Sequence, residues 1–359
     1  MKMHSIAAIA TLSALASASA AAQSAVTLYG VADVGVTYGR GSVASRLQMS
    51  QGNLAASRLG FRGTEDLGGG NSALFTLEAG INVDDGGGQA TNPNNQPPSP
   101  ASTGIAFNRL SYVGLAGPWG QVRLGRDWTP TFTQYLRYDV ANGGGLGVSQ
   151  SALNSIGAYG HPAGLRASNA IEYMSPSWGG LSAHLMYALG ENASNAGAIK
   201  NDGKYAAVRL SYVGNGLDAG LAYATYNIAA LGDIHETVAG ATYGLPWVKL
   251  HAMYTKNTTG SANSMTGGLL GISKAFGATE IRASVSTASV KNAAGVPIGD
   301  ARKLALMGIH NLSKRTSLYA VIAANRNSNG AASIPLNGVA VNGPNGSAEA
   351  VSIGVRHSF

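Results

Sequence analysis

The chain has 359 residues, of which 50 are glycine and none is cysteine, and only 11% are charged with a net charge of +7. A mean hydropathy of +0.05 is too polar for a helical membrane protein, while so few charges are unusual for a soluble enzyme. Glycine costs roughly 1 kcal/mol relative to alanine inside a helix, so its abundance argues against a mainly helical fold. Without cysteine the chain forms no disulfide, thiol nucleophile or thiolate metal site. An all-β fold is therefore expected.

Residues 1–22 are predicted to be a secretory signal peptide. An apolar run follows Lys2, and small residues form the A-x-A pattern of a cleavage site at Ala18, Ala20 and Ala22. This run is too short to cross a membrane as a helix, which takes about 20 residues. We expect cleavage before Gln23, with cleavage after Ala20 as the alternative, so the predicted mature domain spans residues 23–359.

Apolar and polar residues then alternate with a period of two, the pattern of β-strands with one apolar face. In the first such segment one parity carries Val26, Leu28, Val34 and Val36, and the other carries Thr27, Tyr29, Asp33 and Thr37. Similar alternation returns at residues 58–64, 72–82, 248–255, 280–285 and 318–325. This repetition predicts a meander of antiparallel strands.

Connections of two lengths separate the predicted strands. Short turns rich in glycine, such as residues 65–71, 117–120 and 214–216, alternate with long polar segments at residues 39–56, 84–103, 129–164 and 327–347. Short turns at one end and long loops at the other are typical of bacterial outer-membrane barrels. Counting the segments between connections gives about 16 strands, and an even number is usual for such barrels.

The final segment, residues 351–359, ends on Phe359. We expect this strand to pair with the first one, so that the barrel leaves no strand edge exposed to lipid. An aromatic side chain at a strand end also suits the girdle at the membrane interface. A soluble β-sandwich shows the same alternation of residues, but there the phenylalanine would be an exposed apolar chain end, so the barrel is favoured.

Several longer stretches carry a specific pattern: SAVTLYG at 24–30, SRLGFRGTEDLGGG at 57–70, GQVRLGRD at 120–127, HNLSKRT at 310–316 and GVRHSF at 354–359. Spread over the whole mature chain, they resemble the general diffusion porins of Gram-negative bacteria, specifically those of β-proteobacteria. The resemblance implies a 16-stranded antiparallel transmembrane β-barrel in the outer membrane. It also implies a homotrimer in which each subunit has its own water-filled pore, narrowed by an inward-folded third loop.

Residues 129–164 correspond to that third loop. Their length fits independently, because an unstructured excursion of this size in a compact domain is usually functional. In porins of this subgroup three arginines of the wall cluster at the constriction, and the matching positions are Arg58, Arg109 and Arg166. The alternation supports Arg58 and Arg109, which lie on the polar face of their predicted strands, whereas Arg166 rests mostly on the family match.

Other charged residues are predicted to accompany this cluster. Arg62, Arg123 and Arg126 are candidates for flanking pore charges. The candidate acidic counter-charges are Glu78, on the inward parity of its strand, and Asp139, within the predicted constriction loop. Either acid could alternatively pair with one arginine and fix its side chain.

A narrow aqueous passage lined by fixed cations concentrates anions and repels cations. Arginine suits this role because its guanidinium stays charged at any working pH. We therefore expect passive diffusion of ions and small hydrophilic solutes, with a preference for anions and with no cofactor, metal or catalytic step. The predicted partners are outer-membrane lipid, small hydrophilic solutes, anions and further copies of the chain.

Alternative functions leave weaker signals. The sequence lacks the nucleophile elbow, the H-E-x-x-H pair and the phosphate-loop motif of common enzymes. Its 24 basic and 17 acidic residues form no Lys/Arg cluster, so nucleic acid is not an expected partner. A substrate-specific channel stays open, as does a plugged barrel acting as a surface adhesin or structural protein. The recurrence of Thr, Ser, Gly and Arg on the inward parity favours an open lumen over a plug.

Overall fold

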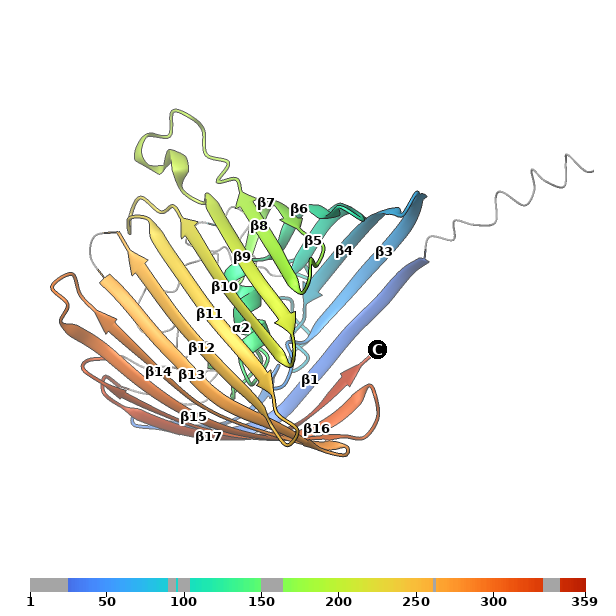
Figure 1. Cartoon of the computed structure of the whole chain (residues 1–359). Helices are drawn as coiled ribbons and strands as arrows, with labels where there is room; N and C mark the ends of the chain where they lie inside the picture. Colours follow the sequence, from blue (N-terminus) through green and yellow to red (C-terminus); the bar gives the residue numbers. More distant parts are fainter. Residues whose placement is uncertain (1–24, 90–94, 96–103, 150–163, 261–262, 332–342) are drawn as a thin grey trace, which may run out of the picture.

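The computed structural model describes residues 25–89, 95, 104–149, 164–260, 263–331 and 343–359. The predicted signal peptide, residues 1–22, lies outside these described residues. Within them, 17 strand segments form one antiparallel sheet that closes on itself (Figure 1).

In chain order the elements are β1 (Ala25–Gly41), β2 (Ser45–Gln51), β3 (Arg58–Gly68), β4 (Asn71–Gly80), β5 (Leu110–Gly117), β6 (Gly120–Trp128), α2 (Pro130–Tyr138), β7 (Arg166–Met174), β8 (Leu181–Ala188), the short 3-10 helix η1 (Gly197–Asn201), β9 (Tyr205–Gly214), β10 (Leu217–Tyr226), β11 (Ile234–Gly244), β12 (Lys249–Thr259), β13 (Asn263–Phe276), β14 (Thr279–Lys291), β15 (Pro297–Asn311), β16 (Thr316–Ser328) and β17 (Ser347–Ser358). None of the helices in the described part of the chain has the length and apolar character needed to span a membrane.

Two of the strand segments share one position in the barrel. Residues 34–40 of β1 pair with β2, and residues 25–31 of the same strand pair with β3. The described segments therefore occupy 16 positions around a closed antiparallel barrel, as predicted. The prediction of one long loop at residues 39–56 is wrong, because β1 runs to Gly41 and β2 begins at Ser45. Leu47 and Met49 alternate with polar neighbours there, which is the strand signal that the polar composition masked.

The barrel closes where β17 pairs with β1. The register runs from Val31 opposite Ser358 to Gly41 opposite Ala348. Next to it, the backbone N–H groups of Gly30 and Phe359 each donate to the other's carbonyl at 3.1 Å. The Phe359 ring covers Gly30 so closely that a Cβ at Gly30 would lie 2.3 Å from it. The structure thus places the C-terminal aromatic side chain on the seam.

Replacing Phe359 with alanine is expected to weaken the seam. The backbone pairing with Gly30 remains, but the ring contact is lost, so the free energy of unfolding falls by about 1 kcal/mol. Urea titration of barrel unfolding in detergent measures the loss. Phe276→Ala is the matched control, because Phe276 is a 61% exposed aromatic residue at the end of β13. Equal losses in the two variants would count against a specific role at the seam.

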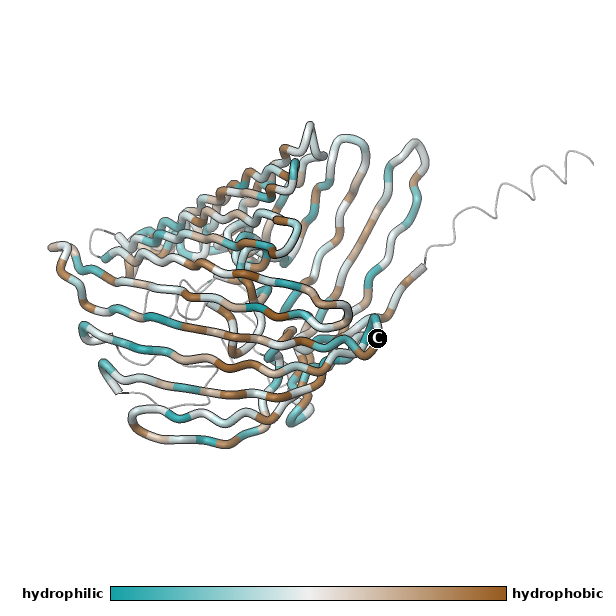
Figure 2. The backbone as a smooth tube through the Cα atoms, turned by 60° about the horizontal axis from the view of Figure 1, so that its bottom comes forward, coloured by the Kyte–Doolittle hydropathy of each residue, from teal (hydrophilic) through white to brown (hydrophobic). Residues whose placement is uncertain are grey.

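The two faces of the wall differ sharply in exposure. On β1, Val36 is 53% exposed and Tyr38 47% exposed, while Thr37 between them is fully buried. The Thr37 hydroxyl donates to Ser352 Oγ of β17 at 2.9 Å on the inner face. The same alternation of hydropathy follows the strands around the barrel (Figure 2). An apolar outer wall and a polar inner wall suit a barrel that crosses a bilayer around an aqueous lumen.

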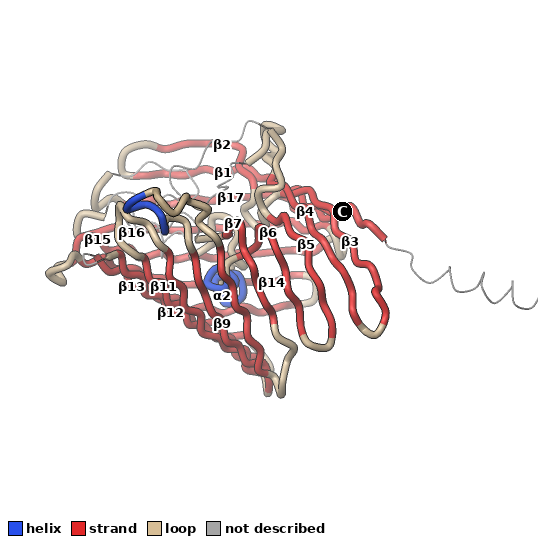
Figure 3. The backbone as a smooth tube through the Cα atoms, turned by 90° about the horizontal axis from the view of Figure 1, so that it is seen from above, coloured by secondary structure: helices blue, strands red, loops and turns tan. Residues whose placement is uncertain are grey.

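The segment after β6 turns into the barrel. Thr129 caps α2, its side chain accepting a hydrogen bond from the Phe132 N–H, and Pro130 occupies the first turn. Seen from above, α2 lies inside the ring of strands (Figure 3). The loop therefore folds inward as predicted, but it is not unstructured, because Thr-Pro is a helix-start signal. Residues 150–163 of the predicted loop lie outside the described residues.

Apolar packing holds the described part of the loop against the inner wall. Residues of the loop pack on inward-facing side chains of β11–β13 in a cluster that includes Phe132, Tyr135, Tyr138, Val140, Val238, Met253, Met265 and Leu269. A second cluster joins Leu146 and Val148 to Met307 and Val321. The wall is thus apolar on its inner face where the loop covers it.

Candidate functional site

The three predicted arginines occupy equivalent places in the fold. Arg58 is the first residue of β3, Arg166 is the first residue of β7, and Arg109 directly precedes β5. All three strands run from the long-loop end of the barrel toward the short turns. This common direction explains how residues far apart in the sequence meet at one depth.

A cavity of about 580 Å³ separates these arginines from the inward loop. The wall contributes Arg58, Glu78, Arg109, Arg166 and Arg356, and the loop contributes Phe132, Leu136, Asn142, Gly143 and Gly144. Residues 54–56, between β2 and β3, line it as well. Among these lining residues the charged groups are four arginines and one glutamate, so the passage is strongly cationic.

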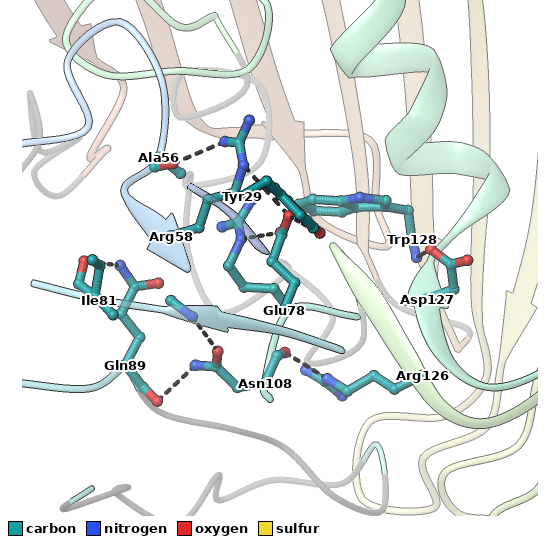
Figure 4. A network of polar contacts seen from close by, with 12 residues as sticks. Tyr29, Ala56, Arg58, Glu78, Ile81, Gln89, Asn108, Arg126, Asp127 and Trp128 are labelled. Carbon is teal, nitrogen blue, oxygen red and sulfur yellow. Dashed lines mark hydrogen bonds and ion pairs between the residues drawn. The ribbon is translucent and has the colours of Figure 1, made fainter. Parts of the chain in front are cut away.

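Glu78 of β4 links two of the arginines. Arg109 Nε donates to Glu78 Oε1 at 2.6 Å, and Arg58 Nε lies 3.4 Å from Oε2. The Tyr29 hydroxyl donates to the same Oε2 at 3.0 Å, and Arg58 Nη1 donates to the Ala56 carbonyl at 2.9 Å (Figure 4). The Glu78 side chain is only 6% exposed, whereas that of Arg58 is 29% exposed. The buried carboxylate of Glu78 therefore fixes the guanidinium groups of Arg58 and Arg109 at the wall, and the Arg58 side chain still lines the cavity.

Trp128, at the end of β6, supports the other side of the cluster. The Arg166 guanidinium lies 3.7 Å from the Trp128 ring centroid, and that of Arg109 lies 5.2 Å from it. Phe132 of α2 stacks on the same indole at 4.9 Å. A cation over an aromatic face is held by the ring quadrupole without loss of its charge. Trp128 thus fixes two arginines and connects them to the loop.

The flanking arginines are placed differently from one another. Arg126 donates from Nε to the Asn108 carbonyl at 2.6 Å, which fixes the residue just before Arg109 (Figure 4). Arg123 Nη1 forms an ion pair with Asp127 Oδ2 at 2.6 Å, and the Arg123 guanidinium lies 4.4 Å from the Tyr112 ring centroid. Neither of these arginines lines the cavity of the main cluster.

Arg62 lies closer to the short turns than Arg58, on the same face of β3. Its guanidinium covers the Tyr29 ring at 5.1 Å, and the side chain is exposed. The Tyr29 ring therefore connects Arg62 to the hydroxyl contact with Glu78. The position suits a flanking charge, and that role stays a prediction.

Asp139 does not join the arginines. It is fully buried at the end of α2, where its carboxylate accepts hydrogen bonds from the N–H groups of Ala141 at 2.7 Å and Ser149 at 2.8 Å, and from the Ser149 hydroxyl. Burial raises the pKa of Asp139, and the hydrogen bonds from Ser149 and Ala141 oppose that rise. Asp139 therefore stabilises the loop through these hydrogen bonds, and its buried carboxylate does not face the passage.

Two cations of the wall hold the loop by its backbone. Arg282 Nη1 donates to the Val140 carbonyl at 3.1 Å, and Lys303 Nζ donates to the Val148 carbonyl at 2.7 Å. Neither contact was predicted from the sequence, and nor were the roles of Trp128 and Arg356. Only the inward parity of Arg282 and Lys303 could have indicated that they point at something inside the barrel.

Replacing Lys303 with methionine is expected to loosen this attachment. The side chain keeps its length, but the Val148 carbonyl loses its donor in a buried place, where an unmatched polar group is costly. Single-channel recordings would then show more frequent brief closures and greater current noise. Lys274→Met is the control, because Lys274 lies on the outward parity of β13. Identical noise in both variants would contradict the assigned contact.

The segment between β2 and β3 also contacts the loop, since Leu54 packs in the same cluster as Leu146 and Val148. Asp33 Oδ2 accepts from the N–H groups of Leu54 at 2.9 Å and Ala55 at 2.6 Å, and Tyr319 donates to Oδ1 at 2.7 Å. The loop comes so close that a Cβ on Gly145 would lie 2.0 Å from the Asn53 carbonyl oxygen. The narrowing is therefore built from two backbone segments in contact.

A closed barrel with an apolar outer wall, an inward loop and a cationic passage defines a channel protein of the bacterial outer membrane. The chain belongs to the Gram-negative porin family, because the model of that family matches residues 7–330. The resemblance and the outer-membrane location predicted from the sequence are thereby confirmed. Members of this family are channels.

Individual relatives agree over most of the chain. Outer membrane porin protein 32 of Delftia acidovorans is 33% identical over 369 residues, covering 99% of each chain. An outer membrane porin protein of Bordetella pertussis is 30% identical over 275 residues, covering 67% of this chain and 66% of that protein. The solved structure titled "Anion-selective porin from Comamonas acidovorans" matches with a TM-score of 0.81 and 32% identity, covering 94% of this chain and 100% of that one.

Proposed function

We propose that this porin is a general diffusion channel that prefers anions. The observation that carries the proposal is the lining of the constriction, where four arginines face one glutamate. The one acid pairs with Arg58 and Arg109 and offsets one of the four positive charges, so positive charge remains in excess along the passage. The similarity to a solved porin whose title calls it anion-selective supports the same assignment.

Selectivity in this proposal is electrostatic. Fixed cations in a narrow passage with low-dielectric walls raise the local concentration of anions and repel cations. The effect weakens with salt, because the Debye length falls from about 10 Å at 0.1 M to about 3 Å at 1 M. Solutes move down their gradients, so the proposed activity needs no catalytic step and no cofactor.

The proposed assembly is a homotrimer with one passage in each subunit. This part rests on the resemblance to porins. It predicts conductance in three equal steps from one inserted complex, and chemical cross-linking that stops at three subunits.

The experiment is single-channel recording of the purified protein in a planar bilayer, with the reversal potential measured across a KCl gradient. We expect anion selectivity that declines as the mean salt concentration rises. Cation selectivity would overturn the proposed anion preference. Inserted, folded protein without conductance would favour the plugged barrel. Saturation of the current by one solute alone would favour the substrate-specific channel.

A further inference from the structure

The lining of the passage includes one arginine that does not belong to the three predicted from the sequence. Arg356 lies on the inward parity of β17, is partly exposed, and lines the cavity between the arginine cluster and the loop. Its Nη2 group donates to Ser317 Oγ at 3.3 Å. Among the residues that the structure describes, Arg356 has no ion pair and its Nε has no acceptor. The guanidinium therefore keeps its full positive charge at the passage.

The other three arginines of this cavity have closer partners. Glu78 forms ion pairs with two of them, and the Trp128 ring lies against two. Within the described part of the chain, Arg356 has neither a carboxylate nor an aromatic ring as a partner. Its charge therefore depends on what happens to the acid nearest to it in the sheet.

The strand register places that acid directly opposite Arg356. Asp33 of β1 pairs with Arg356 of β17, and both residues lie on the inward parity of their strands. Directly opposed residues have Cβ atoms about 4.5–5.5 Å apart, and opposite charges at such positions attract each other. An ion pair between these two residues would cancel the charge of Arg356. The carboxylate of Asp33 has other partners instead.

Three neutral donors occupy the Asp33 carboxylate. The N–H groups of Leu54 and Ala55 donate to Oδ2 at 2.9 Å and 2.6 Å, and the Tyr319 hydroxyl donates to Oδ1 at 2.7 Å. Asp33 is 0% exposed and does not line the cavity. The acid is therefore buried beside the passage, and the arginine opposite it stays uncompensated.

Two glycines allow Tyr319 to reach this carboxylate. Tyr319 belongs to β16, and β17 lies between β16 and β1 in the sheet. A Cβ on Gly354 of β17 would lie 2.2 Å from the Tyr319 hydroxyl oxygen, and a Cβ on Gly35 of β1 would lie 2.9 Å from it. A larger residue at either position would collide with the hydroxyl. The contact that occupies Asp33 therefore depends on residues of three neighbouring strands.

We propose that Arg356 is a fourth arginine that shifts the selectivity of the passage toward anions, and that Tyr319 preserves its charge by occupying Asp33. The inference rests on the proposed anion-preferring channel. Four arginines and one glutamate give the lining three net positive charges, and Arg356 supplies one of them. Arg356 acts on the permeating ions directly. Tyr319 is a positioning residue that acts through Asp33.

The test is the reversal potential of single channels across a KCl gradient at low salt. Arg356→Gln is expected to lower the anion-to-cation permeability ratio about twofold, because it removes one of three net charges that together enrich anions about tenfold. Arg356→Lys keeps the charge and is expected to keep the ratio. Arg302→Gln is the matched control, because it makes the same change on the outward parity of β15.

Tyr319→Phe tests the role of Asp33 without altering Arg356. Loss of the hydroxyl leaves Asp33 Oδ1 available to the arginine opposite, so the permeability ratio is expected to fall by up to about twofold. In the R356Q background the same change is expected to have no effect, because that arginine is absent. Circular dichroism of each variant checks that the barrel is folded. A general loosening of the wall would instead lower the ratio in both backgrounds.

Three results would overturn the proposal. They are an unchanged ratio in Arg356→Gln, an equal fall in Arg302→Gln, and an equal fall on Tyr319→Phe in both backgrounds. Failure of the proposed function has a different signature. The unaltered protein would then be cation-selective, while Arg356→Gln would still shift the reversal potential further toward cations.

Discussion

Replacing Arg58, Arg109 and Arg166 together with glutamine is expected to abolish the anion preference. Of the charged residues that line the constriction, only Arg356 and Glu78 remain, and their charges cancel. The local enrichment of anions by a charged cleft is at least about tenfold, so a loss of that order in the anion-to-cation permeability ratio follows. The reversal potential in a KCl gradient should fall close to zero.

A variant with the same net charge provides the control. R40Q/R302Q/R326Q also removes three arginines, but all three lie on the outward parity of their strands. We expect it to keep the selectivity of the unaltered protein. If both triple variants shift the reversal potential equally, selectivity comes from overall charge and not from the constriction.

Gly145→Val is expected to push the loop away from the wall and widen the passage. Gly145 has a φ of +63°, and a Cβ would lie 2.0 Å from the Asn53 carbonyl oxygen, which is backbone and cannot move aside cheaply. The loop must therefore leave its contact with residues 52–57. Liposome swelling with sugars of increasing size would show a higher size limit, and single-channel conductance would rise.

Gly179→Val is the control for Gly145→Val, because it introduces the same backbone strain without the steric clash. Gly179 has a φ of +59°, close to that of Gly145, but a Cβ there would meet nothing within 4 Å. Valine at this turn therefore carries the same unfavourable φ without displacing the loop. An unchanged size limit is expected. A size limit that also stays unchanged in Gly145→Val would show that the loop contact does not set the width of the passage.

The barrel could be predicted from the sequence because its signal recurs in many of the strands. Each inward or outward position follows from the period of two, and Phe359 indicated where the seam lies. The parity also brought Arg58, Arg109 and Glu78 to the inner face. What the family resemblance added was the meeting of Arg166 with the other two, since its own strand alternates weakly.

The path of the loop could not be predicted in the same way. It depends on inward apolar residues such as Met253 and Met307. They belong to different strands, and each lies on an inward face whose other residues are mostly polar or small. Asp139 was a candidate counter-charge because it lies in the predicted constriction loop, yet its carboxylate accepts hydrogen bonds from Ala141 and Ser149 of the loop itself. Local sequence does not reveal such contacts, since they depend on how the backbone turns after α2.

The described part of the loop gives the constriction no charged side chain. Arg137, the basic residue of α2, pairs instead with Asp218 of β10 at 2.7 Å. Charge discrimination and size exclusion are therefore encoded in separate parts of the chain, the first mainly at the strand starts and the second in the loop and the segment between β2 and β3 that it contacts. Mutation can then retune which sizes pass while the preferred sign of charge is inherited unchanged.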